Sequence, residues 1–115
     1  MQHYHIWFDL RPGAKDLAFA EAMDAFLEHM KAAGTIESWR LERRTLGLCS
    51  ADLGEWHVDI ATTDLGQLQK AFDAITPRSG DEERLQAMVW KDVTNLKFAL
   101  YRDFPDANRP ERSGP

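Results

Sequence analysis

Two histidines near the N-terminus are spaced so that both could act at one site. His3 and His5 are separated by one residue within residues 2–10, a segment whose composition is typical of a β-strand. Because side chains alternate between the two faces of a strand, both imidazoles would lie on the same face. Imidazole titrates near neutral pH and binds zinc, iron and copper, so the pair could supply acid–base chemistry or hold a metal.

A second chemically capable pair, His57 and Asp59, lies on one face of a strand predicted over residues 55–62. If this strand neighbours residues 2–10 in a sheet, three imidazoles and a carboxylate come together. In that arrangement His5 or His57 would be the general acid or base, and Asp59 would orient it. These three residues are the candidate catalytic set.

Other side chains on the same strand faces could contact a ligand. The candidates, which share the polar faces of the strands, are His3, Trp7, Asn95, Lys97 and Tyr101. Trp7 and Tyr101 would pack against a substrate ring, while Asn95 and Lys97 would contact an anionic or phenolic group.

The same residues would also suit a subunit interface or a metal site. In an interface between two subunits, the polar groups would be satisfied by one another and by water. For Lys97, the alternative to ligand binding is an ion pair with Asp59 inside the cleft. A metal site is the third alternative, but a His-x-His pair alone is a weak signal, and we expect no metal and no cofactor.

Hydrophobic periodicity predicts the elements that would position these residues. The expected strands are residues 2–10, 36–46, 55–62 and 95–103, and the expected helices are residues 15–33, 65–75 and 82–91. Asp64 with Gln67 forms a capping box before the second helix, and Asp81 is expected to cap the third. The helix residues expected to be buried are Leu17, Ala20, Met23, Leu27, Met30, Leu65, Leu68, Phe72, Ile75, Leu85, Met88 and Val89.

This order of elements predicts an α+β, ferredoxin-like βαββαβ sandwich with a four-stranded antiparallel sheet and helices on one face. The apolar strand rows expected to face the helices are Tyr4/Ile6/Phe8, Trp39/Leu41, Trp56/Val58/Ile60 and Leu96/Phe98/Leu100. The opposite face carries Trp7 and Tyr101 beside three histidines, so we expect a second copy to cover it and form a homodimer. The domain would span residues 1–104, followed by a tail over residues 105–115.

Composition narrows the class of protein. The chain has 115 residues, a net charge of −5 and 43% hydrophobic residues, which is typical of one globular domain. An acidic chain lacks the basic surface that nucleic acids and anionic membranes attract, so we expect neither as a partner. The sequence Glu-Trp-His-Val-Asp-Ile also lacks the aromatic pattern of an RNA-recognition motif. A single cysteine, Cys49, and the absence of a signal peptide or an apolar span predict a cytoplasmic protein.

The sequence resembles the dimeric alpha-beta barrel superfamily, which has ferredoxin-like subunits. The segments HYHIWFDLRPG, GEWHVDI and NLKFALYRDFPD are similar to those of a small bacterial family of uncharacterised proteins in it. The resemblance extends to about Pro105 and implies the fold and the dimer. The superfamily includes cofactor-independent monooxygenases, haem-degrading oxygenases, isomerases and stress-responsive proteins. None of their catalytic motifs can be assigned to residues of this chain.

We therefore expect a homodimer with a small-molecule pocket between its helices and the barrel-side sheet face. It would bind an aromatic or polyketide-like compound and act as a cofactor-independent oxygenase or isomerase. The alternative is a non-catalytic, stress-responsive or ligand-sensing dimeric module. The sequence is compatible with both functions, enzyme and binding module.

Overall fold

The computed structural model describes residues 1–75 and 80–105. Its elements, in chain order, are β1 (Gln2–Leu10), α1 (Asp16–Ala32), β2 (Ser38–Arg43), β3 (Trp56–Thr62), α2 (Leu65–Ile75), α3 (Asp81–Trp90) and β4 (Val93–Arg102). The predicted elements are all present, although β2 is shorter than expected at both ends. The predicted tail, residues 105–115, lies outside the described residues apart from Pro105.

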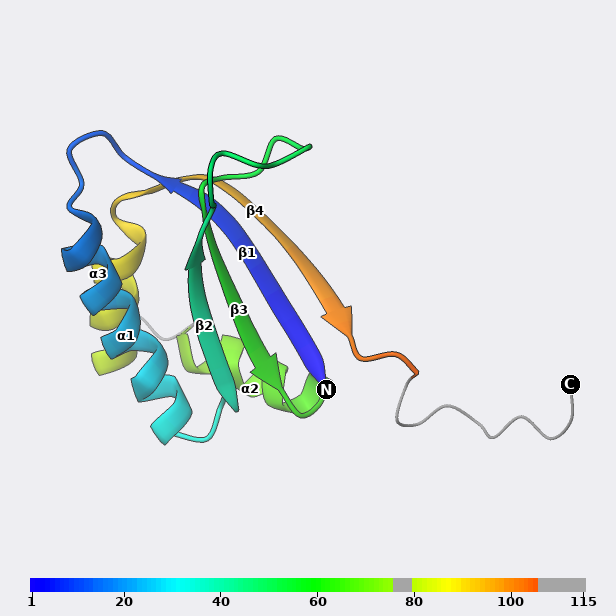
Figure 1. Ribbon diagram of the computed structural model, residues 1–115. Coiled ribbons are helices and arrows are strands. Elements are labelled where there is room, and N and C mark those ends of the chain that lie inside the picture. The colour runs from blue at the N-terminus through cyan, green and yellow to red at the C-terminus, as the bar shows by residue number, and fades with distance from the viewer. Residues whose placement is uncertain (76–79, 106–115) are drawn as a thin grey trace, which may run out of the picture.

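The four strands form one antiparallel sheet in the order β2-β3-β1-β4. The helices lie on one side of this sheet, as Figure 1 shows. The predicted ferredoxin-like fold is thus confirmed, with β1 and β3 at the centre. In the register of β1 and β3, Trp7 lies opposite His57 and His5 opposite Asp59, so the predicted chemical residues are direct cross-strand neighbours.

Helix α1 packs on the sheet through a stripe that differs in part from the predicted one. Its buried residues are Phe19, Met23, Phe26, Leu27 and Met30, which follow the spacing of one helix face. The expectation that Leu17 is buried is wrong, because its side chain is 77% exposed. Leu17 precedes Met23 by six residues, which places it about 240° around the helix from the buried stripe.

The two shorter helices bury fewer residues than predicted. Leu68 and Ala71 are buried on α2, and Val89 is fully buried on α3. Leu65 and Met88 are exposed and Phe72 is partly exposed, contrary to expectation. Gly80, not Asp81, occupies the N-cap position of α3 and makes no side-chain cap. At α2, Asp64 does accept a hydrogen bond from the Gln67 backbone N–H at 2.8 Å, as the capping box predicts.

The apolar row of β4 is also more exposed than predicted. Phe98 lies opposite Ile6 in the sheet, so the assignment of its face is correct. Yet Leu96, Phe98 and Leu100 are 53%, 66% and 47% exposed, and the expectation that helices cover them is wrong. Helices α1 and α2 pack over β2 and β3, and β4 is the far edge strand of the sheet (Figure 1). Among residues 1–75 and 80–105, no helix is long and apolar enough to cross a membrane.

Candidate functional site

A histidine cluster lies on the sheet face that the helices leave uncovered. His5 Nδ1 and His57 Nε2 are 2.8 Å apart, a hydrogen-bond distance. The prediction that an imidazole of β1 reaches a partner on β3 is therefore confirmed. Both side chains are about one-fifth exposed, so the pair is partly shielded by its neighbours on the sheet.

Carboxylates lie at both ends of this histidine pair. Glu42 Oε1 is 3.0 Å from His57 Nδ1, and Asp59 Oδ1 is 4.0 Å from His5 Nε2. The same Asp59 oxygen lies 3.8 Å from His3 Nδ1 and is buried without a hydrogen bond to any described residue. His3 instead contacts Asp103 at 2.7 Å through Nε2.

Glu42 and Asp103 were not among the predicted site residues. Strand parity places Glu42 on the polar face, and the β2–β3 register sets it directly opposite His57. That parity was the signal that could have identified Glu42. Asp103 belongs to the strand predicted over residues 95–103 and has the parity of Lys97 and Tyr101, so the same signal pointed to it, although β4 itself ends at Arg102.

Aromatic rings pack around the histidine pair. The ring of His5 stacks on His57 with centroids 5.0 Å apart, and Trp7 stacks on His57 at 5.1 Å. Tyr101 meets His5 edge-on at 5.2 Å. Burial lowers the pKa of His5, and His57 and His3 lower it further, while Asp59 acts in the opposite direction. The predicted neighbours Trp7 and Tyr101 are thus brought to the cluster.

Two predicted ligand-binding residues are engaged elsewhere. Asn95 lies at a bulge of β4 with a φ of 53°, and its amide donates to Asp9 at 3.1 Å. Asp9 also accepts the Glu55 backbone N–H at 2.8 Å, and this bond is the main cause of its lowered pKa. Asp9 thereby joins β1 to both neighbouring strands, and Asn95 supports that junction.

Lys97 does not form the expected ion pair with Asp59. Its ammonium group lies 3.1 Å from a carboxylate oxygen of Asp52 and also donates to the Asp52 backbone carbonyl. Asp52 belongs to the loop between β2 and β3, so this contact ties that loop to β4. Among the described residues, no group of three or more His, Cys, Asp or Glu side chains is arranged to hold a metal ion.

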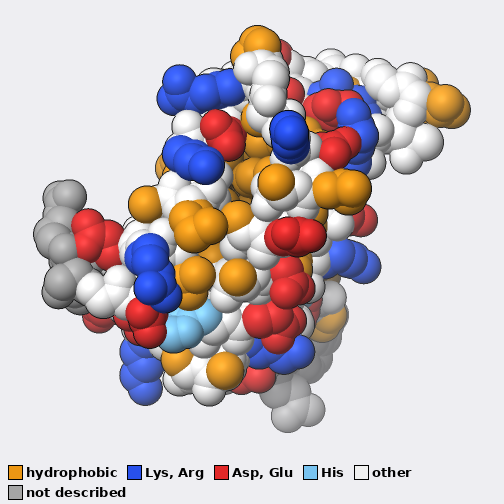
Figure 2. All heavy atoms as spheres, turned by 90° about the vertical axis from the view of Figure 1, so that its left-hand side faces the viewer, with side chains coloured by type: hydrophobic (Ala, Val, Ile, Leu, Met, Phe, Trp, Pro, Cys, Tyr) orange, Lys and Arg blue, Asp and Glu red, His pale blue; other side chains and the backbone are white. Residues whose placement is uncertain are grey.

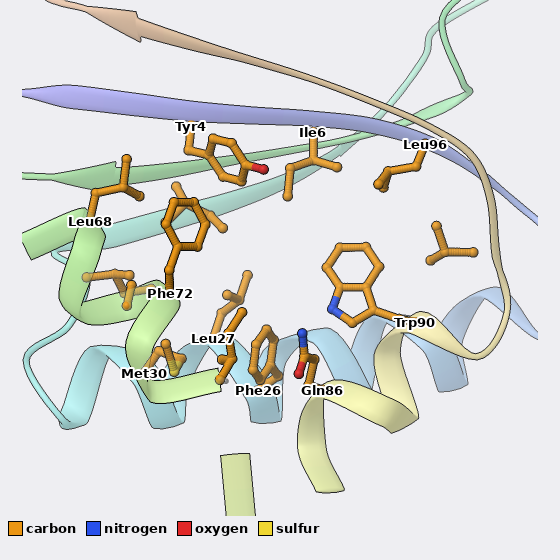
Figure 3. Close-up of a pocket in the computed structure, with 15 residues that line it drawn as sticks. Tyr4, Ile6, Phe26, Leu27, Met30, Leu68, Phe72, Gln86, Trp90 and Leu96 are labelled. Carbon is orange, nitrogen blue, oxygen red and sulfur yellow. The ribbon is translucent and has the colours of Figure 1, made fainter. Parts of the chain in front are cut away.

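A large apolar pocket lies on the opposite side of the sheet, between the sheet and the helices (Figure 3). Its volume is about 460 Å³, within the range typical of small-molecule sites. The lining residues are Tyr4, Ile6, Phe26, Leu27, Met30, Ile36, Ile60, Leu68, Ala71, Phe72, Ile75, Gln86, Trp90, Val93 and Leu96. The expectation of a pocket next to the helices holds, but the predicted chemical residues lie behind the sheet and do not line it.

Two lining residues of the pocket are exposed. Phe72 on α2 is 38% exposed, and Leu96 near the start of β4 is 53% exposed. The ring of Tyr4, which also lines the pocket, meets Phe72 edge-on at 5.5 Å. Seen from the helix side, the surface carries interspersed acidic and basic side chains, with hydrophobic side chains between them (Figure 2).

Among the described lining residues, three side chains carry nitrogen or oxygen atoms. Tyr4 from β1 points its hydroxyl into the space, while Gln86 and Trp90 approach from α3 (Figure 3). Burial raises the pKa of the Tyr4 phenol, which therefore stays protonated at neutral pH. Sequence reasoning expected a pocket next to the helices but named none of its lining residues as site residues, because each reads separately as ordinary core.

Solved structures with the same fold show which class of protein the geometry defines. An Arabidopsis thaliana protein, At3g17210, matches with a TM-score of 0.69 at 4% identity, over 90% of this chain and 95% of that chain. A dimeric ferredoxin-like protein of unknown function from Jannaschia matches with a TM-score of 0.59 at 16% identity, over 90% and 100%. A Bacillus halodurans protein of the ethyl tert-butyl ether degradation family matches with a TM-score of 0.55 at 11% identity, over 90% and 99%. The chain is therefore an α+β protein of the ferredoxin-like class.

The sequence also places the chain in a particular family. A family model matches residues 1–114, and the chain belongs to this family of unknown function, DUF6614. No curated protein matches the sequence.

Proposed function

We propose that this protein binds a small, largely apolar compound in the pocket between its helices and its sheet. The observation that carries the proposal is the pocket itself, about 460 Å³ of apolar-lined space in a domain of 13.2 kDa. Protein interiors are normally packed with few voids larger than a water molecule. An apolar space of this size, with a few polar atoms directed into it, is the usual form of a small-molecule site.

The pocket supports binding more strongly than acid–base chemistry. Among the described residues, no Asp, Glu, His, Lys or Arg lines it. Tyr4 is its one titratable lining group there, and its phenol is neutral at pH 7, because its ordinary pKa of 10.0 is raised further by burial. A ligand-binding or ligand-sensing module is therefore the leading function.

Conversion of a compound bound on the helix-free sheet face is the second candidate, as a cofactor-independent oxygenase or isomerase acting on an aromatic or polyketide-like compound. The favouring observation is the chain from Glu42 through His57 to His5, which could move a proton along hydrogen-bond distances. In this role Asp59 would orient His5, and His3, Trp7 and Tyr101 would contact the substrate. Loss of turnover in His5→Ala with unchanged binding in the apolar pocket would support an active site on this face.

A homodimer is the proposed assembly. Several solved structures with this fold, from Bacteroides fragilis, Jannaschia and Thermobifida fusca, are described as dimeric. In this chain the helix-free sheet face carries Trp7, partly exposed, and Tyr101, 59% exposed. A second copy placed on this face would cover both rings. The net charge of −5 supports neither nucleic acid nor an anionic membrane as a partner.

Binding in the pocket is tested with N-phenyl-1-naphthylamine, an uncharged apolar probe whose fluorescence rises in apolar surroundings. The wild-type protein should bind it saturably. Ala71 is 7% exposed and lines the pocket, so Ala71→Leu should fill the space and weaken binding at least about tenfold. Ala87→Leu, the same change at an exposed position of α3, is the matched control and should bind as the wild type does.

Two results would contradict the proposed function. One is the absence of saturable probe binding by the wild-type protein. The other is an Ala71→Leu variant that unfolds with the wild-type midpoint yet binds the probe with wild-type affinity, because the probe would then occupy another surface.

A further inference from the structure

We propose that the ligand of the pocket is an uncharged aromatic ketone, ether or phenol, whose oxygen accepts a hydrogen bond from Tyr4 on one wall or from Gln86, beside Trp90, on the opposite wall. This inference rests on the proposed function and specifies the chemical class that the same pocket selects. It draws on three features of the lining: its charge, its polar atoms and its aromatic rings.

The lack of charged side chains in the described lining excludes ionised ligands. No charged side chain lines the pocket in residues 1–75 and 80–105. An ion moved from water into apolar surroundings without a partner pays a large desolvation penalty, which nothing described in this pocket would offset. A carboxylate or an ammonium group should therefore be rejected, and a neutral compound of the same shape accepted.

The polar atoms of the lining suit an oxygen acceptor. The phenol of Tyr4, the amide of Gln86 and the indole N–H of Trp90 can each donate a hydrogen bond. None of these side-chain groups hydrogen-bonds to another described residue, and each is partly buried. Gln86 and Trp90 are four residues apart on α3, so they lie on one face of that helix, and Tyr4 faces them across the pocket (Figure 3).

Tyr4 is held in place by contacts on two sides of its ring. Phe72 meets it edge-on at 5.5 Å, and Phe98 lies tilted against it at 6.1 Å. These contacts fix the direction of a hydroxyl that otherwise makes no bond to the described protein. A fixed donor loses little conformational freedom when a ligand oxygen arrives, so it contributes to selectivity.

The walls of the pocket favour a ring over an extended chain. Phe26, Phe72 and Trp90 contribute aromatic rings to the lining, and aromatic pairs gain interaction energy beyond the apolar area that they bury. Apart from Tyr4, Met30 and Gln86, the remaining described lining residues are aliphatic. A fused bicyclic ring carrying one oxygen combines the properties that the lining selects.

The test compares the affinities of four naphthalenes that share one ring system and differ at one position. We expect 2-naphthol and 2-methoxynaphthalene to bind most tightly, because both offer a neutral oxygen. Without that oxygen, 2-methylnaphthalene should bind about tenfold more weakly. With its charge, 2-naphthoate should bind at least about 100-fold more weakly than 2-naphthol.

Variants assign the selectivity to the named residues. Tyr4→Phe or Gln86→Leu, whichever removes the donor that the oxygen uses, should reduce the preference for 2-methoxynaphthalene over 2-methylnaphthalene, while binding of 2-methylnaphthalene stays near the wild-type value. Gln69→Leu makes the same change as Gln86→Leu at an exposed position of α2 that does not line the pocket, and it should leave the preference unchanged. Competition with N-phenyl-1-naphthylamine reports all the affinities in one assay.

Failure of this inference is distinguishable from failure of the proposed function. If the neutral naphthalenes bind but 2-naphthoate binds as tightly, or if the methyl and methoxy compounds bind equally, the pocket binds ligands without the proposed selectivity and the inference is overturned. A preference that persists in both Tyr4→Phe and Gln86→Leu would also overturn it. If no neutral naphthalene binds, the proposed function fails as well.

Discussion

At the scale of single residues, the histidine cluster is organised by its carboxylates. Glu42 accepts a hydrogen bond from His57 at one end, and Asp59 leaves a buried oxygen without a hydrogen bond to any described residue at the other. When both imidazoles of the His5–His57 pair are neutral, one proton lies between them and the Nε2 atom of His5 is a bare acceptor facing Asp59. A single added proton would supply the missing donor.

The pH dependence of His5 follows from its surroundings. Burial and the neighbouring imidazoles lower its pKa from the ordinary value of 6.5, so above that value the group is neutral in both the folded and the unfolded chain. As the pH falls below 6.5, His5 takes up its proton first in the unfolded chain. The free energy of unfolding therefore decreases until the pH falls below the pKa of His5 in the folded chain. In an NMR titration, the His5 midpoint should lie below 6.5.

Asp59→Asn provides the matched control for this titration. Asp59 is the main group that opposes the lowering, so its neutralisation should move the His5 midpoint further down. Urea unfolding should show the wild-type free energy of unfolding decreasing from about pH 7 to pH 5. A His5 midpoint at or above 6.5 in the wild-type protein would show that the electrostatics of the pair are assigned wrongly.

At the scale of elements, the sequence predicts faces better than it predicts burial. Parity correctly placed Phe98 on the side of Ile6 and the histidines on the other side. It could not show that β4 extends past the helices, because periodicity reports which way a side chain points and not what covers it. The same limit explains why the partner of Lys97 was not predicted. That partner, Asp52, lies in a loop that strand parity does not describe.

The junction of β1 with the loop that precedes β3 depends on one glycine. A Cβ atom at Gly54 would lie 2.2 Å from the carbonyl carbon and oxygen of Phe8, which are backbone atoms of a central strand. Gly54→Ala should therefore lower the free energy of unfolding by at least about 1–3 kcal/mol, the usual cost of forcing atoms into a packed site. Ser50→Ala, at an exposed position of the same loop, is the control and should change stability by less than about 0.5 kcal/mol.

Guanidinium unfolding curves of the two variants, recorded under the same conditions, measure this difference. Equal stabilities of Gly54→Ala and the wild-type protein would show that the loop moves away from β1 at no measurable cost, and that the close approach does not constrain the fold.

At the scale of the whole molecule, the order of elements was enough to predict the sheet and the side on which the helices lie. A pocket beside the helices was expected, but its lining was not predictable, because a cavity is the space that remains after all side chains have packed, and no single residue signals it. Its lining comes from every helix and from three of the four strands. Residues such as Gln86 and Trp90 acquire a shared role only once α3 is placed over β1.

The proposed homodimer is tested by light scattering coupled to gel filtration. The mass should be near twice 13.2 kDa. Trp7→Lys should shift the protein toward the monomer, because it places an unpaired charge in a face expected to be buried. Lys70→Ala, an exposed change on α2, should leave the mass unchanged. A wild-type monomer at micromolar concentration would contradict the assembly and leave the histidine face open to solvent.

The most direct test of the central claim is the position of a bound compound. A crystal soaked with 6-bromo-2-naphthol would show the bromine by its anomalous scattering and the ring by its density. We expect the ring between Phe72 and Trp90, with its oxygen within hydrogen-bond distance of Tyr4 or Gln86. A fully occupied ligand against His5 and Trp7 on the other face, with the apolar pocket empty, would contradict ligand binding between the helices and the sheet.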